Sequence, residues 1–294
     1  MARPLIGLAL GAGGARGWCH IGVIRALARM DIVPDVIAGT SMGALVGAAA
    51  AGGALDALED WARSQTATRY LGRLDVRLTG GGIVGGAEIG AVIGGLPMPQ
   101  TIEALPVPFA AVACDIATGE EVWLRAGSLP DAVRASVAMP GVIAAHRDGD
   151  RWLIDGGVVN PIPVAVARAL GAEVVIAVNP NLRPAAQFWR PAPPAGPLAD
   201  IAPFLPEAIR GLLPQTTRET AQAPGYLELV STTLEILTDR IQRSRIAGDA
   251  PHVLLGARLA HLSVFDFHRA AEAIAEGERM VAAQADWIAA VVAR

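Results

Sequence analysis

The sequence predicts an α/β fold with a mostly parallel central sheet. Short apolar runs alternate along the chain with segments whose apolar residues recur at helical spacing, a rhythm typical of strand–helix–strand units. The chain has 294 residues and 52% of them are hydrophobic, so it can bury a large core. Both observations favour one large α/β domain.

The first elements follow from the apolar pattern. Residues 5–10 form an apolar run that stops at the glycine cluster 11–17, which predicts a strand and a tight turn. Residues 20–30 then carry apolar side chains at helical spacing. A second short apolar run at 36–38 precedes the small residues of 42–51, which predict a closely packed helix.

The pattern continues beyond these two units. Residues 55–63 are amphipathic and predict a helix, and the glycine-rich stretch 79–95 predicts a loop with a short helix at 87–93. The apolar runs 109–115 and 121–125 flank a turn and predict two adjacent strands.

The middle of the chain returns to strand and helix in turn. A helix is expected over 129–138, where Pro140-Gly141 stops it, and a strand over 152–154, which ends at Asp155. A helix at 163–170 and a buried strand at 174–178 follow.

Composition changes after this strand. Residues 181–224 are rich in Pro and Ala, and they predict an insertion or flap within a single domain spanning 1–294. Apolar side chains within this segment predict a mobile flap that contacts lipid or covers the site, and a disordered insertion is an almost equally supported alternative. A helix at 226–245, a strand at 253–255 and a long terminal helix from 267 complete the expected fold.

Charge and residue usage exclude several functions. The net charge is −4, which argues against nucleic acid as a partner. All 24 basic residues are Arg, so chemistry that needs a catalytic or phosphate-binding Lys is excluded. The chain has two Cys and no cluster with metal-ligand spacing, so neither a metal nor a cofactor is expected. Such cysteine usage favours a cytoplasmic protein, and neither a signal peptide nor a spanning helix is expected.

Gly39-Thr40-Ser41-Met42-Gly43 is a GxSxG pentapeptide between an expected strand and an expected helix. This context is that of a nucleophile elbow, in which Ser41 is exposed on a sharp turn and Gly39 and Gly43 avoid clashes. A serine that caps a helix after a tight turn is the alternative explanation.

Gly13-Gly14-Ala15-Arg16-Gly17 follows the first expected strand. A glycine-rich turn that opens a helix presents backbone N–H groups to a phosphate or an oxyanion. A dinucleotide-binding fingerprint fits poorly, because Arg16 stands where its third glycine would be.

Asp155-Gly156-Gly157 follows the expected strand 152–154. An acid at the end of a strand, followed by two glycines, is held in place while the chain turns away. Taken alone, an ordinary Asp-Gly turn explains it as well.

The order of these three motifs resembles that of the patatin-like phospholipase family. The block 135–141 resembles the segment ahead of that family's acid, and 17–23 and 265–270 resemble the small bacterial branch related to neuropathy target esterase, the RssA-type proteins. The resemblance covers nearly the whole chain apart from 181–224. Ala12 departs from it, since many members have a third glycine there.

The resemblance implies a three-layer α/β/α patatin-like fold and a serine acyl hydrolase with a Ser–Asp dyad. Ser41 would be the nucleophile and Asp155 the base. The oxyanion hole would comprise the N–H groups of Gly13, Gly14 and Ala15, with Arg16 ordering the loop. The implied substrates are phospholipid, lysophospholipid or another acyl ester. Such substrates are compatible with peripheral contact of the protein with the inner membrane surface. The sequence does not define head group, chain length or oligomeric state.

Two other functions stay open at this point. An α/β-hydrolase esterase would use Ser41, Asp155 and a late histidine, for which His252, His261 and His268 are candidates. Against this, Ser41 comes early in the chain for that fold. A non-catalytic regulatory or dinucleotide-binding module would instead use the glycine-rich loop to hold a phosphate.

Overall fold

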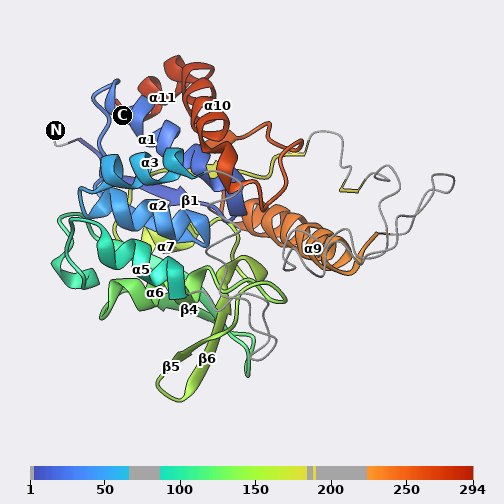
Figure 1. Cartoon of the computed structure of the whole chain (residues 1–294). Helices are drawn as coiled ribbons and strands as arrows, with labels where there is room; N and C mark the ends of the chain where they lie inside the picture. The colour runs from blue at the N-terminus through green and yellow to red at the C-terminus, as the bar shows by residue number, and fades with distance from the viewer. Residues whose placement is uncertain (1–2, 66–86, 184–187, 190–223, 294) are drawn as a thin grey trace, which may run out of the picture.

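The computed structural model of the chain describes residues 3–65, 87–183, 188–189 and 224–293. An eight-stranded sheet lies at the centre of this part (Figure 1). Seven strands follow the order β5-β6-β3-β2-β1-β7-β8, and β4 pairs with β3 outside this path. The strands are β1 Ile6–Leu10, β2 Val36–Thr40, β3 Phe109–Asp115, β4 Glu121–Leu124, β5 His146–Asp148, β6 Arg151–Asp155, β7 Val174–Asn179 and β8 Val253–Gly256.

The sheet has a parallel part and an antiparallel part. Strands β3, β2, β1, β7 and β8 run parallel to their neighbours in this order. Strand β3 also pairs in antiparallel fashion with β4 and β6, and β6 pairs likewise with β5. The expected mostly parallel sheet is confirmed, and the antiparallel strands lie at the end that carries Asp155.

Helices connect the strands and cover the sheet. The α-helices are α1 Cys19–Ala28, α2 Met42–Ala51, α3 Leu55–Ser64, α5 Ala87–Gly95, α6 Leu129–Ser136, α7 Val164–Ala169, α9 Tyr226–Gly248, α10 Ala270–Ala282 and α11 Ala285–Val292. Short 3₁₀ turns are η1 Gly14–Trp18, η2 Ile102–Ala104, η3 Gly156–Val158 and η5 Phe267–Arg269.

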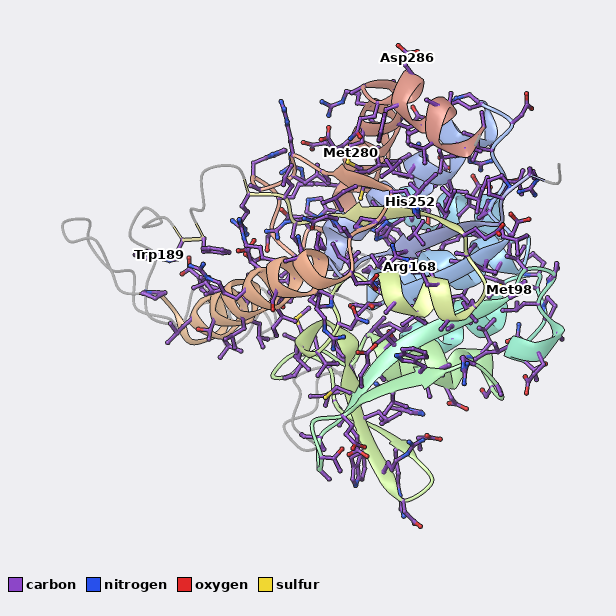
Figure 2. All side chains as sticks on the ribbon, turned by 180° about the vertical axis from the view of Figure 1, so that it is seen from behind. Met98, Arg168, Trp189, His252, Met280 and Asp286 are labelled. Atoms are coloured by element: carbon purple, nitrogen blue, oxygen red, sulfur yellow. The ribbon has the colours of Figure 1, made fainter. Side chains whose placement is uncertain are left out.

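Side chains of β1 alternate between two cores on opposite faces of the sheet. Leu8 and Leu10 belong to the larger core, which also contains residues of α1, α2 and α10. Ala9 belongs to the second core, which is closed by α7. Figure 2, seen from behind, shows α7 with Arg168 over this second face. The two cores on opposite faces form a three-layer α/β/α arrangement, as expected from the resemblance.

The structure departs from the sequence-based elements in two places. Strand β5, with the sequence His-Arg-Asp, was not expected, because three polar residues give no apolar run. The single helix expected from 267 was wrong: after a short 3₁₀ turn it is divided into α10 and α11. Gln284, which lies between the two helices, has φ −125°, outside the helical region, and α11 buries Ile288 and Val291.

Most of the expected insertion, 181–224, lies outside the described residues. Trp189, which belongs to it, lies beside the N-terminal half of α9 (Figure 2), where its indole N–H donates to Glu228 Oε1 at 2.9 Å. Among the residues that the structure describes, no helix combines the length and apolar character needed to cross a bilayer.

Candidate active site

The strand register brings the ends of β2 and β6 together. Both strands pair with the same edge of β3, since β4 occupies the opposite edge over the same residues. Strand β2 runs parallel to β3 and ends with Thr40 beside Val112, whereas β6 runs antiparallel and ends with Asp155 beside Ala113. The carboxyl ends of β2 and β6 therefore face each other, one β3 residue apart. The next residue after β2 is Ser41.

Ser41 occupies a sharp turn between β2 and α2. Its backbone has φ 57° and ψ −123°, a conformation that non-glycine residues rarely adopt. The flanking glycines permit close approach: a Cβ at Gly43 would lie 2.0 Å from Leu10 O, and one at Gly39 would lie 2.4 Å from Gly43 O. These contacts explain why the pentapeptide needs glycine at both ends, and they account for a serine held out on a strained elbow.

The side chains of Ser41 and Asp155 meet directly. Ser41 Oγ donates to Asp155 Oδ2 at 2.6 Å, and Gly157 N–H donates to Asp155 Oδ1 at 2.7 Å. Both side chains are buried, with exposures of 4% for Ser41 and 5% for Asp155. The pair is thus a hydroxyl donor and a carboxylate acceptor shielded from bulk water.

Burial raises the pKa of Asp155 to about 6, although the hydrogen bonds from Ser41 and Gly157 act in the opposite direction. Burial disfavours the charged carboxylate because the site offers less solvation than water does. A carboxylate with a raised pKa is a stronger base than an exposed one, and it is still ionised at neutral pH.

The raised pKa makes a prediction for stability. Because the folded-state pKa of Asp155 exceeds its ordinary value of 3.8, the native state binds more protons between pH 4 and 6, and ionisation there costs stability as pH rises. We expect Asp155→Asn, which removes this cost, to gain up to about 3 kcal/mol in unfolding free energy between pH 4 and pH 8, relative to the parent. Thermal unfolding of both proteins across this range measures the effect.

Asp35→Asn is the matched control, because the Arg3 guanidinium holds the pKa of the Asp35 carboxyl below its usual range. Its pH dependence should have the opposite sign: the variant should lose stability relative to the parent as pH rises. A pH-independent difference between Asp155→Asn and the parent would contradict the raised pKa.

The glycine-rich loop lies beside this pair, and two of its amides are free to bind. In the described part of the chain, the N–H groups of Gly13 and Gly14 have no acceptor. The N–H of Ala15 donates to Val264 O at 2.8 Å, and that of Arg16 donates to Gly13 O at 3.2 Å. The structure therefore leaves Gly13 and Gly14 available, while the expected donor at Ala15 is already occupied.

Arg16 connects this loop to α9. Its side chain is buried and donates to Leu262 O, Asn181 Oδ1 and Glu235 Oε1 at 2.8, 3.0 and 2.9 Å. Burial lowers the pKa of Arg16, and the Glu235 carboxylate opposes this change. Arg183 pairs with the same carboxylate. A partly buried ionic cluster thus joins the glycine-rich loop, the segment after β7 and helix α9.

Two cavities meet at Ser41. The larger has a volume of about 590 Å³, and apolar and aromatic side chains predominate in its lining, including Trp18, Leu45 and Trp61. The smaller has a volume of about 70 Å³ and contains Asp155, Gly13 and polar residues of α9. Ser41 and Gly14 line both cavities. The larger volume is within the usual range for small-molecule sites.

The histidines lie elsewhere. None of the five, all within the described ranges, lines either cavity at Ser41. His252 Nδ1 accepts from Val175 N–H, and His261 pairs with Glu272. His20 is buried against Gly11 O, and burial lowers its pKa to about 4. The geometry gives no histidine partner for Ser41, so the triad alternative lacks support.

Three residues at the site were not assigned by the sequence analysis. Ser136 binds the backbone of Ser41, Val264 lines both cavities and accepts from the glycine-rich loop, and Glu235 binds Arg16. Ser136 belongs to the block 135–141 that carried the family resemblance, which was the available signal. Val264 and Glu235 carry no local motif.

Comparison with known proteins finds a family model and relatives that belong to one family, the patatin-like phospholipases and NTE proteins. The family model described as "Patatin-like phospholipase" matches residues 8–168, more than half of the chain. The uncharacterized NTE family protein Rv1063c of Mycobacterium tuberculosis is 34% identical over 97% of this chain and 92% of its own length. Patatin-like phospholipase domain-containing protein 7 of Mus musculus is 34% identical over 62% of this chain and 14% of its own.

One solved structure is also similar. VipD from Legionella pneumophila matches 55% of this chain and 47% of its own chain, at 12% identity and a TM-score of 0.36. The family model and the relative from Mycobacterium tuberculosis show the family of this chain. The family as a whole supports lipid acyl hydrolase activity in general terms. The chain belongs to the patatin-like phospholipase family.

Proposed function

We propose that this protein is a serine acyl hydrolase that cleaves a phospholipid, lysophospholipid or related acyl ester through a Ser41–Asp155 dyad. The observation that carries the proposal is the buried 2.6 Å hydrogen bond between these two side chains, beside an apolar cavity of about 590 Å³. A nucleophile, a base and a space for an acyl chain are then adjacent.

The chemistry follows from the contacts. Asp155 Oδ2 takes the hydroxyl proton as Ser41 Oγ attacks the ester carbonyl carbon, and the carbonyl oxygen becomes an oxyanion. The free N–H groups of Gly13 and Gly14 stabilise this charge. The tetrahedral intermediate collapses to an acyl-enzyme, and the leaving alcohol receives the proton from Asp155. Water, activated by the same carboxylate, then releases the fatty acid and restores Ser41.

In this proposal the acyl chain and the alcohol of the substrate lie in different cavities. The acyl chain occupies the larger cavity, because its burial there removes apolar surface from water. The alcohol lies toward the smaller cavity, where α9 contributes Ser231, Glu235 and Thr238. We further propose that the described elements form a single hydrolase domain, since every strand belongs to one sheet.

A covalent probe tests the proposal. A fluorophosphonate should label the protein with one equivalent, and peptide mass spectrometry should place the adduct on Ser41. The same preparation should release fatty acid from lysophospholipid. Labelling that persists in Ser41→Ala, or the absence of any ester hydrolysis by the labelling-competent protein, would contradict the proposal.

The cavity predicts a chain-length effect. Ala57 on α3 lines the larger cavity, so Ala57→Phe should fill part of it. We expect the ratio of kcat/KM for palmitoyl over butyryl p-nitrophenyl esters to fall roughly tenfold or more, since lost apolar contacts penalise long chains. Steady-state kinetics on the two esters measure this ratio.

Ala282→Phe is the control, because Ala282 is exposed on α10 and lines neither cavity at Ser41. It should leave the ratio unchanged. If Ala57→Phe lowers both rates equally, the acyl chain does not occupy this cavity.

A further inference from the structure

Ser136 lies at the C-terminal end of α6 and contacts the elbow from within the core. Its side chain is fully buried, with 0% exposure. Ser136 Oγ accepts from Ser41 N–H at 2.9 Å and donates to Val112 O at 2.6 Å. One hydroxyl therefore satisfies two backbone groups that the sheet leaves unpaired.

The unpaired groups arise from the geometry of the strands. Val112 lies opposite Thr40, the last residue of β2, and Asp155 ends β6 beside the next residue of β3. The Val112 carbonyl faces the gap between the two strand ends, where a Cβ at Gly156 would lie only 2.3 Å from it. The Ser136 hydroxyl lies between the Val112 carbonyl and Ser41 N–H, and it bridges the two groups.

The same segment also holds the carboxylate. Asp155 N–H donates to Ala138 O at 2.9 Å, two residues after Ser136. The chain from 136 to 138 thus binds the backbone of Ser41 on one side and that of Asp155 on the other. The separation of the two side chains depends on this third segment as well as on the sheet.

We infer that Ser136 is a positioning residue for the nucleophile: its hydroxyl anchors the strained backbone of Ser41 so that Oγ stays within hydrogen-bond reach of Asp155. This inference rests on the proposed function. Ser41 has φ 57°, and a conformation of this kind persists only when surrounding contacts hold it. Within the part of the chain that the structure describes, the Ser41 carbonyl accepts from Ala44 and Leu45 of α2, whereas its N–H donates to Ser136, which lies outside the turn and α2.

The position of Ser136 separates its effect on chemistry from any effect on binding. Ser136 lines neither of the cavities at Ser41, so a substrate in them does not contact it. Loss of the hydroxyl should therefore lower kcat and leave KM nearly unchanged. Small misplacements of reacting groups lower rates strongly, because reaction requires a narrow range of distances and angles.

The first test is Ser136→Ala, with active sites titrated by the fluorophosphonate so that only folded, reactive protein is counted. We expect kcat per titrated site on a short-chain ester to fall between about tenfold and a hundredfold. The rate constant for labelling should fall in parallel. An unchanged rate per titrated site would overturn the inference.

Ser128→Ala is the matched control. Ser128 caps the N-terminus of the same helix, accepting from Asp131 N–H at 3.3 Å, and is exposed. Its loss should lower the thermal midpoint of unfolding while the rate per titrated site remains at the parent value. A purely structural role for Ser136 would make the two variants behave alike.

Ser136→Thr and Ser136→Val form a second pair, since both add the same bulk to the buried site and only one keeps a hydroxyl. We expect Ser136→Thr to exceed Ser136→Val by roughly tenfold or more in rate per titrated site. Equal rates would contradict the positioning role. If the parent itself neither labels nor hydrolyses esters, the proposed function fails; if the parent is active and the variants match it, only this inference fails.

Discussion

Asp155→Asn should abolish hydrolysis while the protein stays folded, and Ser41→Ala should do the same. Asparagine keeps the shape of Asp155 and can accept from Gly157 N–H, but it cannot take the proton of Ser41 Oγ. We expect kcat to fall by a factor on the order of ten thousand or more in each variant. The double variant should have a kcat no lower than that of the less active single variant, because both groups act in one step.

The histidine variants provide the contrast. His252→Asn, His261→Gln and His268→Gln should each retain most of the activity, since none of these side chains lines the cavities at Ser41. Loss of activity in one of them, with the fold intact by circular dichroism, would replace the dyad with a triad.

The pH profile of the parent tests the same assignment independently. Because the base must be ionised and burial raises the pKa of Asp155 to about 6, kcat should fall about tenfold per pH unit below that value. None of the three histidine variants should move this acid limb.

Gly14→Ala should reduce turnover by about a hundredfold or more, the cost of losing one oxyanion donor. Gly14 has φ +53°, and a Cβ there would lie 2.5 Å from Val264 O. Backbone cannot yield as a flexible side chain would, so the methyl group must shift the loop that presents the Gly13 and Gly14 amides. The measurement is kcat per active site, with labelling of Ser41 as the check that the nucleophile remains present.

Gly53→Ala is the control for backbone strain. Gly53 also has positive φ, at +74°, but nothing lies within 4 Å of its Cβ position. Both substitutions carry a cost from the left-handed backbone, while only Gly14→Ala displaces the loop. Full turnover in a folded Gly14→Ala protein would show that the oxyanion is stabilised elsewhere.

The ionic cluster around Glu235 connects α9 to the glycine-rich loop beside Ser41 and Asp155. Arg16 belongs to the loop that carries Gly13 and Gly14, and its carboxylate partner Glu235 comes from α9. Helix α9 also lines the smaller cavity through Ser231 and Thr238. Helix α9 and the glycine-rich loop are therefore physically connected, and in the proposed mechanism this contact links the helix to the loop that carries the oxyanion donors.

The sequence by itself determined most of the elements and the local form of the motifs, although it missed β5 and the division of the terminal helix. Apolar runs and helical spacing located the parallel strands, because burial imposes these periods on any α/β chain. Gly39 and Gly43 marked the elbow, and the requirement at Gly39 is local, because a Cβ there would lie 2.4 Å from Gly43 O. These features depend on neighbours in the chain or on a single buried face, and a linear pattern records them.

Only the tertiary structure decided which of these parts meet. The approach of Asp155 to Ser41 depends on β6 pairing antiparallel with the same edge of β3 as β2, directly beyond the point where β2 ends, a register that no local pattern specifies. The occupied amide of Ala15 depends on Val264, nearly 250 residues away in the chain. The hydroxyl of Ser136 acquires its two partners only because β2 ends beside Val112 and β6 ends beside the next residue of β3. Hydrogen bonds between distant segments are set by packing, and packing is decided by the whole chain at once.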